Sequence, residues 1–361
     1  MSRFKITKHI SLGVMAFTLC LNTTNVAAQN KKAVQATKIP VVAKDPEISR
    51  ETKQFLAALN GAGGAPLETL SPQAARKILV DAQASVKVDY SGIEESEKTI
   101  STDGYTIKLN IVRPQGATET LPVFIFIHGG GWVLGDYPTH KRMVRDLVVQ
   151  SGAVGVFVNY TPSPEAHYPQ AVNEIYAATK WVAAHGAEIN VDGTRLSVVG
   201  NSVGGNMTAV TALKAIENNG PKITSLVMFW PIVDHDFTTE TYKRFGKDRF
   251  LTTPLMKWMY DNYTTKEAER NQIYASPIKA SAELLKKFPP TLIQVAEADI
   301  LREEGEAFGR KLDNAGATVT TIRYNGTIHD FGLLNALAET PQTKSLFIHA
   351  AAELKKYLFK K

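Results

Sequence analysis

The stretch Gly200-Asn201-Ser202-Val203-Gly204 decides the fold of this chain. It follows the short apolar run Leu196-Ser197-Val198-Val199 and opens a segment rich in Ala, Leu and Thr, so we expect a strand to turn sharply into a helix here. Such a turn requires small residues two positions on either side of the serine, because a larger side chain would clash with the strained backbone. The pattern therefore predicts that Ser202 stands at a helix N-terminus and presents its hydroxyl as a nucleophile.

Apolar runs alternate with helical stretches on both sides of this turn. The strands that they predict are 105–112, 123–127, 154–160, 196–199, 226–230, 292–296 and 319–324. The helices between them include 139–150, 171–184 and 204–216. Strands that are apolar along their whole length and alternate with helices imply a mostly parallel sheet with helices on both faces. Together with the strand-turn-helix at Ser202, this predicts the α/β-hydrolase fold.

Two segments fit the alternation poorly, and we expect them to form a helical cap over the strand ends. Residues 45–85 contain a helix that the glycine-rich stretch 61–64 ends and a second one that begins near Ser71-Pro72. Residues 234–285 are rich in Met and aromatic side chains, whose helical spacing favours packing within the cap over the lining of a substrate pocket. The predicted organisation is one domain over 45–361, preceded by a flexible polar segment, 29–44.

The run His128-Gly129-Gly130-Gly131-Trp132 follows the predicted strand 123–127. Three glycines bring no side chain to pack and let the backbone approach another group closely. After a central strand, that group is a developing negative charge, as in an oxyanion hole. A tight turn is the alternative explanation for the glycines alone. A histidine that ends a central strand is more often a support for the loop than a base.

A serine nucleophile needs a base and an acid. His329 follows the last predicted strand, whereas the later His349 falls within a C-terminal amphipathic helix, so His329 is the better candidate in the order serine, acid, histidine. Asp299 follows the preceding strand and would hold the imidazole tautomer. Asp330 would need a strained geometry to serve, because it adjoins His329 in sequence. The remaining rivals for the acid are Glu297, Glu303 and Glu304.

Taken together, these motifs resemble the hormone-sensitive lipase family of α/β-hydrolases, the bacterial esterases with an HGGG motif. The resemblance runs from about Asp45 to the C-terminus and rests on the stretches 128–131, 200–206, 299–306 and 329–331, with an echo at 163–172. It implies a helical cap that roofs the acyl pocket and activity on esters of short to medium acyl chains. It implies the triad Ser202, Asp299 and His329. The implied oxyanion donors are the backbone N–H groups of Gly130, Gly131 and Val203.

The chain departs from the family pattern at two places. The elbow usually reads Gly-Asp-Ser-Ala-Gly-Gly, and here Asn201 and Val203 replace the Asp and the Ala. We therefore expect activity with a modified rate or acyl preference. The second departure is the stretch 159–162, which reads Asn-Tyr-Thr-Pro where the family carries Asp-Tyr-Arg-Leu. The loss of that arginine puts a structural ion pair in doubt, with Glu165 as one candidate partner.

The first 28 residues have the composition of a secretory signal. Arg3, Lys5 and Lys8 lead into an apolar stretch, and Val26-Ala27-Ala28 offers a cleavage site that would make Gln29 the mature N-terminus. We therefore expect export, to the periplasm or the medium, without a stable membrane anchor. The chain's one cysteine lies within this leader, so the mature chain would have no disulfide and no thiolate site. Of the 41 basic residues, three lie in the leader, which leaves 38 against 35 acidic residues and no nucleic-acid footprint.

The sequence thus predicts an exported serine carboxylesterase that works through an acyl-enzyme on a small ester, with no metal or organic cofactor. One alternative is a serine peptidase or amidase, which uses the same triad. Another is a ligand-binding protein on this fold, although such proteins typically lose the serine or the histidine. The oligomeric state and the natural substrate stay open.

Overall fold

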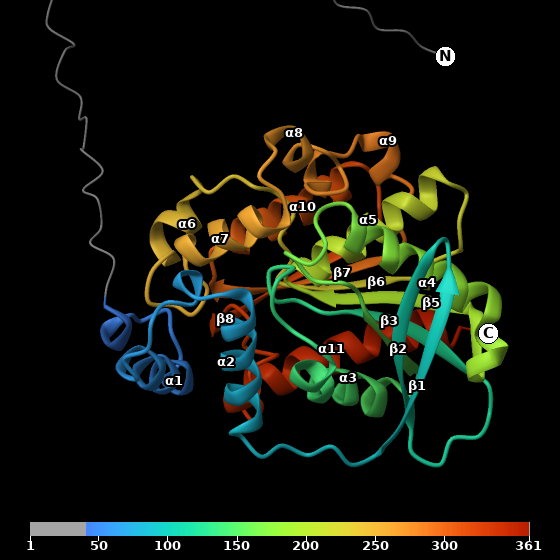
Figure 1. Cartoon of the computed structure of the whole chain (residues 1–361), viewed down its shortest axis with the longest axis horizontal. Coiled ribbons are helices and arrows are strands. Elements are labelled where there is room, and N and C mark those ends of the chain that lie inside the picture. The colour runs from blue at the N-terminus through green and yellow to red at the C-terminus, as the bar shows by residue number, and fades with distance from the viewer. Residues whose placement is uncertain (1–40, 361) are drawn as a thin grey trace, which may run out of the picture. The chain divides into compact units, whose positions relative to one another are not determined.

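The computed structural model describes residues 41–360, which belong to one compact unit. The predictions for the leader, 1–28, and for most of the polar segment, 29–40, lie outside these residues. Within 41–360 the chain builds an eight-stranded sheet in the order β1-β2-β4-β3-β5-β6-β7-β8 (Figure 1). Its strands are β1 (Ile93–Thr102), β2 (Tyr105–Pro114), β3 (Leu121–Ile127), β4 (Val154–Asn159), β5 (Val191–Asn201), β6 (Leu226–Phe229), β7 (Thr291–Ala298) and β8 (Val319–Ile328).

The pairing confirms the predicted α/β-hydrolase fold. The strands from β4 through β8 pair in parallel, whereas β1 pairs with β2, and β2 with β4, in antiparallel fashion. Strand β3 lies in the middle of the sheet, and all its residues are buried, so its side chains are covered on both faces. A strand buried on both faces cannot carry polar side chains, which explains its unbroken apolar sequence.

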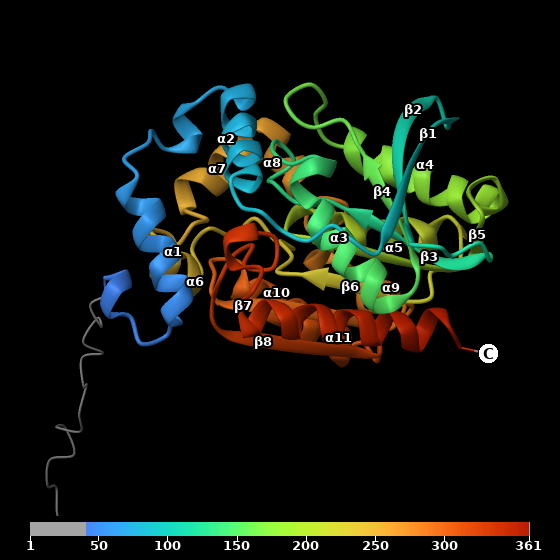
Figure 2. The same ribbon diagram turned by 90° about the horizontal axis from the view of Figure 1, so that it is seen from below.

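Helices cover both faces of the sheet. In Figures 1 and 2, α3 (Tyr137–Ser151) and α11 (Pro341–Leu358) lie on one face. The other face carries α4 (Gln170–His185), α5 (Val203–Glu217) and α10 (Arg302–Asn314). The predicted helices 139–150, 171–184 and 204–216 correspond to α3, α4 and α5, with ends that differ by one or two residues.

Parts of the two segments that broke the alternation lie together at one end of the sheet (Figure 1). The first forms the 3-10 turn η1 (Val42–Lys44), then α1 (Arg50–Gly61), η2 (Leu67–Thr69) and α2 (Pro72–Ala84). The second forms α6 (Glu240–Phe245), α7 (Thr253–Tyr263), α8 (Glu267–Arg270), η4 (Pro277–Lys279) and α9 (Ala282–Leu285). Two further 3-10 turns are η3 (Gly186–Ile189) and η5 (Asn335–Leu337).

The first helix starts later than Asp45, where the helical pattern begins in the sequence. Ser49 accepts a hydrogen bond from Thr52 N at 3.3 Å, so the helix begins at Arg50. Asp45 instead forms a fully buried ion pair with Arg249, with Oδ2 and Nη2 2.6 Å apart. This pair ties the start of the described chain to the segment between α6 and α7.

One strand was not predicted. β1 has the sequence IEESEKTIST, and of its ten residues only Ile100 is fully buried. It pairs with β2 along its whole length at the edge of the sheet, so backbone hydrogen bonds rather than apolar burial hold it there. An edge strand with a polar sequence gives little periodic signal.

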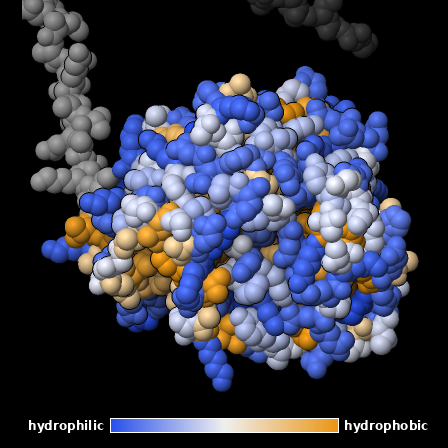
Figure 3. Space-filling view, in the orientation of Figure 1, coloured by the Kyte–Doolittle hydropathy of each residue, from blue (hydrophilic) through white to orange (hydrophobic). Residues whose placement is uncertain are grey.

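The surface is mostly polar, with one apolar area on the face shown in Figure 3, at the end of the molecule where α1 and α2 lie. Exposed large apolar side chains include Leu59 of α1 and Ile78 of α2. No helix within residues 41–360 is both long enough and apolar enough to cross a membrane.

Candidate active site

The nucleophile elbow forms as the sequence predicts. Ser202 sits between the end of β5 and the start of α5 with φ +54° and ψ −120°, a conformation that side-chain-bearing residues rarely adopt. Its N–H donates to Phe229 O at 2.9 Å, which fixes the turn against β6. A Cβ atom on Gly204 would overlap the carbonyl oxygen of Ile127, and one on Gly200 would overlap that of Gly204. Glycine at both positions is therefore a steric requirement of the turn.

The structure brings Ser202, His329 and Asp299 together in one hydrogen-bonded chain. His329 Nε2 lies 3.0 Å from Ser202 Oγ, and its Nδ1 lies 2.8 Å from Asp299 Oδ2. Asp299 Oδ1 accepts the N–H of Leu301 at 3.0 Å, which holds the carboxylate in place. All three residues are less than 5% exposed. This is the geometry in which a histidine takes a proton from a serine while a carboxylate orients the ring.

Electrostatics favour a histidine that accepts a proton readily. Burial lowers the pKa of the His329 imidazole, but the charges of Asp299 and Asp330 outweigh burial and hold that pKa above its ordinary value. The first turn of α5 adds the positive end of a helix dipole beside Ser202.

The other candidate acids and bases have different partners. Glu297 accepts the N–H of Gly326, Glu303 that of Thr241, and Glu304 those of Val233 and Asp234. His349 lies on α11 against the hydroxyl of Tyr324, at 2.6 Å.

His128 is a buried support for the glycine loop. Its ring stacks between Phe157 and Tyr160, at centroid distances of 5.3 and 4.2 Å, and its Nδ1 lies 2.8 Å from Gly129 O. Burial lowers the pKa of His128 to about 4, so the ring is neutral at neutral pH.

The glycine run lies directly beside the elbow. Gly129 N–H donates to Asn201 Oδ1 at 2.9 Å, so this amide is already taken and Gly130 and Gly131 remain as the glycine donors that the resemblance implies. Both have positive φ, +104° and +64°. A Cβ atom on Gly131 would overlap the sulfur of Met259, so α7 packs directly on the loop. Val203, the third implied donor, is the first residue of α5.

The structure shows which residues form contacts at the stretch 159–162, the second departure from the family pattern. Thr161, at the place of the family's arginine, donates from N and Oγ1 to Glu174 at 2.6 and 2.9 Å. Glu165 keeps an ion pair, because Arg76 of α2 reaches both of its carboxylate oxygens at 2.8 and 2.7 Å. The ion-pair partner of Glu165 therefore comes from α2, which is distant in sequence, so local sequence spacing could not reveal it.

Asp330 lies closer to the triad than the sequence suggested. Its φ is +60°, and the carboxylate that contacts His329 Nδ1 is that of Asp299, not that of Asp330. Its Oδ2 instead lies 3.9 Å from His329 Nε2, the nitrogen that faces the serine. Its Oδ1 accepts from Trp230 Nε1 at 2.7 Å and from Asn201 Nδ2 at 3.2 Å.

Aromatic residues that flank the motifs pack inside the protein. Trp132 is fully buried and stacks on Tyr263 of α7 at 4.1 Å, and Phe331 packs on Trp230 at 5.0 Å. Tyr137, at the start of α3, donates its hydroxyl to Glu95. The segment 234–285 thus contacts the glycine loop through Met259 and Tyr263.

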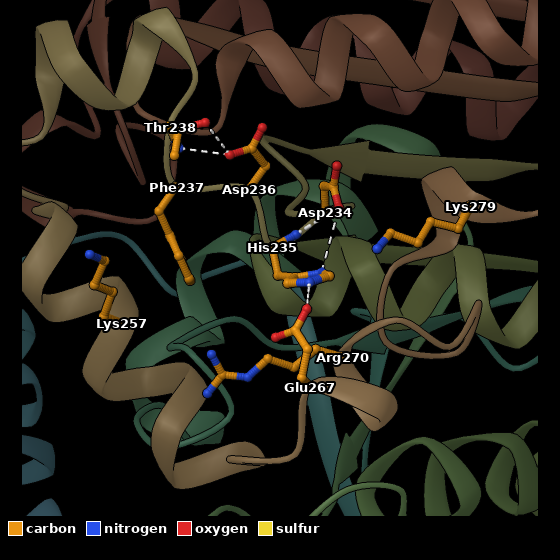
Figure 4. A pocket seen from close by; sticks show the side chains of 9 residues that line it. All are labelled: Asp234, His235, Asp236, Phe237, Thr238, Lys257, Glu267, Arg270 and Lys279. Atoms are coloured by element: carbon orange, nitrogen blue, oxygen red, sulfur yellow. Dashed lines mark hydrogen bonds and ion pairs between the residues drawn. The ribbon is translucent and has the colours of Figure 1, made fainter.

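A separate hollow of about 580 Å³ lies beside α7 and α8 (Figure 4). Several of its charged side chains already have partners: His235 Nε2 lies 2.9 Å from Glu267, and Arg270 donates to Asp261 and to Thr264 O outside the hollow. None of the triad residues lines it. Among residues 41–360 there is also no group of three or more His, Cys, Asp or Glu side chains that could hold a metal ion.

Comparison with known proteins identifies the family. Residues 124–333 match the family model described as the alpha/beta hydrolase fold, and the chain belongs to that family. A thermostable esterase from Pseudomonas putida, known from a crystal structure, is 58% identical with a TM-score of 0.87 over 88% of this chain and 99% of that one.

Two relatives known by sequence cover most of the chain as well. A putative alpha/beta hydrolase of Acanthamoeba polyphaga mimivirus is 34% identical over 84% of this chain and 86% of its own. An ethyl acetate hydrolase from Pseudomonas putida is 27% identical over 76% of this chain and 87% of its own. The fold and these esterase relatives support a carboxylic ester hydrolase.

Proposed function

We propose that this protein is an exported serine carboxylesterase of the HGGG-containing hormone-sensitive lipase group, acting on short- to medium-chain esters. The observation that carries the proposal is the chain Asp299–His329–Ser202 beside the glycine run. His329 Nε2 takes the Ser202 proton as Oγ attacks the ester carbonyl carbon, and the imidazolium then protonates the departing alcohol. Water hydrolyses the acyl-enzyme by the same route.

The oxyanion donors in this proposal are the N–H groups of Gly130, Gly131 and Val203. Each preorganised donor is worth about 3 kcal/mol of transition-state stabilisation. Asn201 supports the arrangement, because it holds Gly129 while standing next to Ser202 in the chain. The β-branched Val203 replaces the usual alanine but leaves its N–H in the chain, so the donor is retained.

The cap and the substrate are part of the same proposal. The helices of 45–85 and 234–285 form the cap, and α7 packs on the oxyanion loop where Met259 meets Gly131. The name of the ethyl acetate hydrolase supports a preference for small esters. For the leader, we propose cleavage after Ala28. Export of the full chain from a bacterial host with Gln29 as the first residue would support this, and retention with an intact leader would contradict it.

The direct test is hydrolysis of p-nitrophenyl acetate by the purified protein and by Ser202→Ala. We expect the substitution to lower kcat by about four to six orders of magnitude, because it removes the nucleophile of the triad. Full turnover by the variant would overturn the assignment. A series of p-nitrophenyl esters of increasing chain length would then define the acyl preference.

Two matched measurements separate the alternatives. An anilide with the same acyl group as the ester tests for a peptidase or amidase, which would cleave both. A fluorophosphonate probe tests for a non-catalytic binding protein, which would bind the ester without labelling of Ser202. We expect labelling that Ser202→Ala abolishes.

A further inference from the structure

A second carboxylate faces the triad histidine from the side of the serine. Asp330 Oδ2 lies 3.9 Å from His329 Nε2, whereas Asp299 contacts the opposite nitrogen, Nδ1. Asp330 is buried, with 6% of its surface exposed, so water screens this interaction weakly. The imidazole therefore stands between two carboxylates on its two nitrogens.

The carboxylate of Asp330 is held in place by two donors from different strands. Trp230, at the end of β6, donates its indole N–H to Oδ1 at 2.7 Å, and Asn201, at the end of β5, donates its amide at 3.2 Å. The backbone carbonyl of Asp330 accepts from Leu333 N and Leu334 N, which closes a turn around its positive φ. In this conformation the carboxylate lies beside His329, with Oδ2 3.9 Å from Nε2.

Asn201 is the link between Asp330 and the glycine run. One end of its amide accepts from Gly129 N, and the other donates to Asp330. A carboxylate at position 201 could keep the first bond but not the second. It would place two acids in contact, and one of them would then retain a proton.

We propose that Asp330 is a positioning residue for His329: its carboxylate stabilises the imidazolium that forms when His329 takes the Ser202 proton, and Asn201 keeps that carboxylate ionised. The inference rests on the proposed esterase function. In the step concerned, the proton moves from Ser202 Oγ to His329 Nε2 while Oγ bonds to the carbonyl carbon and the carbonyl electron pair moves to its oxygen. Asp330 exchanges no proton.

The other groups around the imidazole do not supply this effect. The residues that face it are Asp299 after β7, Ser202 at the start of α5 and the neutral indole of Trp230, whose ring centroid is 6.3 Å away. Tyr242 of α6 and Glu304 of α10 interact with Asp299 and not with the imidazole, and burial raises the pKa of each well above its ordinary value. Burial also raises the pKa of Asp330, which its two donors oppose.

The test is the pH dependence of kcat/KM, whose acidic limb reports the ionisation of His329 in the free enzyme. Removal of an opposite charge within about 4 Å lowers the pKa of the partner by about 1 to 3 units. We expect Asp330→Asn, which keeps the side-chain shape, to move the acidic limb down by that amount. An unmoved limb in active Asp330→Asn enzyme would overturn the proposal.

Asn201→Asp tests the link and does not depend on how well Asp330→Asn folds. The resembled elbow carries Asp at this position, and the bond to Gly129 N can persist, so the variant is expected to fold. We expect a smaller shift of the acidic limb in the same direction. A limb that stays in place or rises would overturn the role given to Asn201.

A control variant and the activity of the unaltered protein distinguish failure of the role proposed for Asp330 from failure of the esterase assignment. Glu174→Gln neutralises another buried carboxylate, one bonded to Thr161 and not to the triad, and should leave the acidic limb unchanged. Absence of ester hydrolysis by the unaltered protein at every pH would reject the function itself. Active variants with unchanged pH profiles would reject only the role of Asp330.

Discussion

A methyl group on Gly204 would overlap the carbonyl oxygen of Ile127, an atom of the central strand that cannot move aside. We therefore expect Gly204→Ala to lower the free energy of unfolding by about 3 kcal/mol or more, the upper range for overpacking of a buried site. Urea denaturation measures this change directly.

Gly61→Ala is the matched control for that substitution. Gly61 is the last residue of α1, and a Cβ atom there meets nothing within 4 Å. Alanine is the better helix former, so the control should be neutral or stabilise by up to about 1 kcal/mol. Equal effects of the two substitutions would contradict the steric argument for Gly204.

The side chains of the triad were predictable because each follows a strand in a fixed order, and such placement depends only on local patterns. The contacts of Asn201 with Gly129 and Asp330 were not, since they join the ends of three different segments. The sequence did mark Asn201 as a departure from the resembled elbow. The sequence could not show that the Asn201 amide also donates to the carboxylate of Asp330.

At the scale of elements, Arg76 connects α2 to the loop that follows the glycine run. Its Nε donates to Val133 O at 2.7 Å, and its Nη2 donates to Ser163 O at 2.8 Å in addition to the pair with Glu165. Three groups from the body of the protein therefore bind one side chain of the proposed cap.

We expect Arg76→Ala to lower the free energy of unfolding by about 2 kcal/mol, because it leaves the two carbonyl groups without this donor. Looser positioning of the loop should also lower kcat/KM, by about tenfold. Lys77→Ala, the next residue on α2, removes only an exposed pair with Asp81 and should change neither quantity. Identical behaviour of the two variants would rule out the connecting role of Arg76.

The ion pair between Arg76 and Glu165 predicts a pH dependence of stability. Hydrogen bonds from Arg76 lower the pKa of Glu165 to about 2, from an ordinary value of 4.5. Since the folded-state pKa is the lower one, the stabilisation is fully present above about pH 4.5 and is lost as the pH falls toward 2. The Tm difference between the unaltered protein and Glu165→Gln should therefore be constant near pH 7 and shrink as the pH falls from about 4.5 toward 2. A difference that grows on acidification would have the wrong sign.

At the scale of the whole molecule, the buried pair Asp45–Arg249 joins the start of the described chain to the segment before α7. Loss of one charge of a buried ion pair is costly, so Asp45→Asn should lower the free energy of unfolding by about 3 to 5 kcal/mol. Glu51→Gln, which affects only the exposed pair with Arg50, is the control and should have little effect. Thermal and urea unfolding measure both, and a small loss for Asp45→Asn would show that the pair is dispensable.

The central parallel strands, such as β3 and β6, were predictable because they are buried on both faces, which leaves an unbroken apolar sequence. β1 was missed for the opposite reason, since its side chains are mostly exposed and only its backbone pairs with β2. The start of α1 at Arg50 was also not predicted, because the helical pattern of the sequence extends back to Asp45. Asp45 is buried in an ion pair with Arg249 and lies outside the helix.

The two edges of the sheet have a consequence for how molecules of this protein meet one another. β1 presents the charged side chains of Glu94, Glu95, Glu97 and Lys98. At the other edge, Ile48 already bridges Gly326 of β8, and Ser49 N–H donates to Gly326 O. Charged side chains and prior pairing are two ways in which proteins prevent strands of neighbouring molecules from adding to an open sheet. Resistance to edge-to-edge aggregation is thus built into the same segments that sequence patterns described least well.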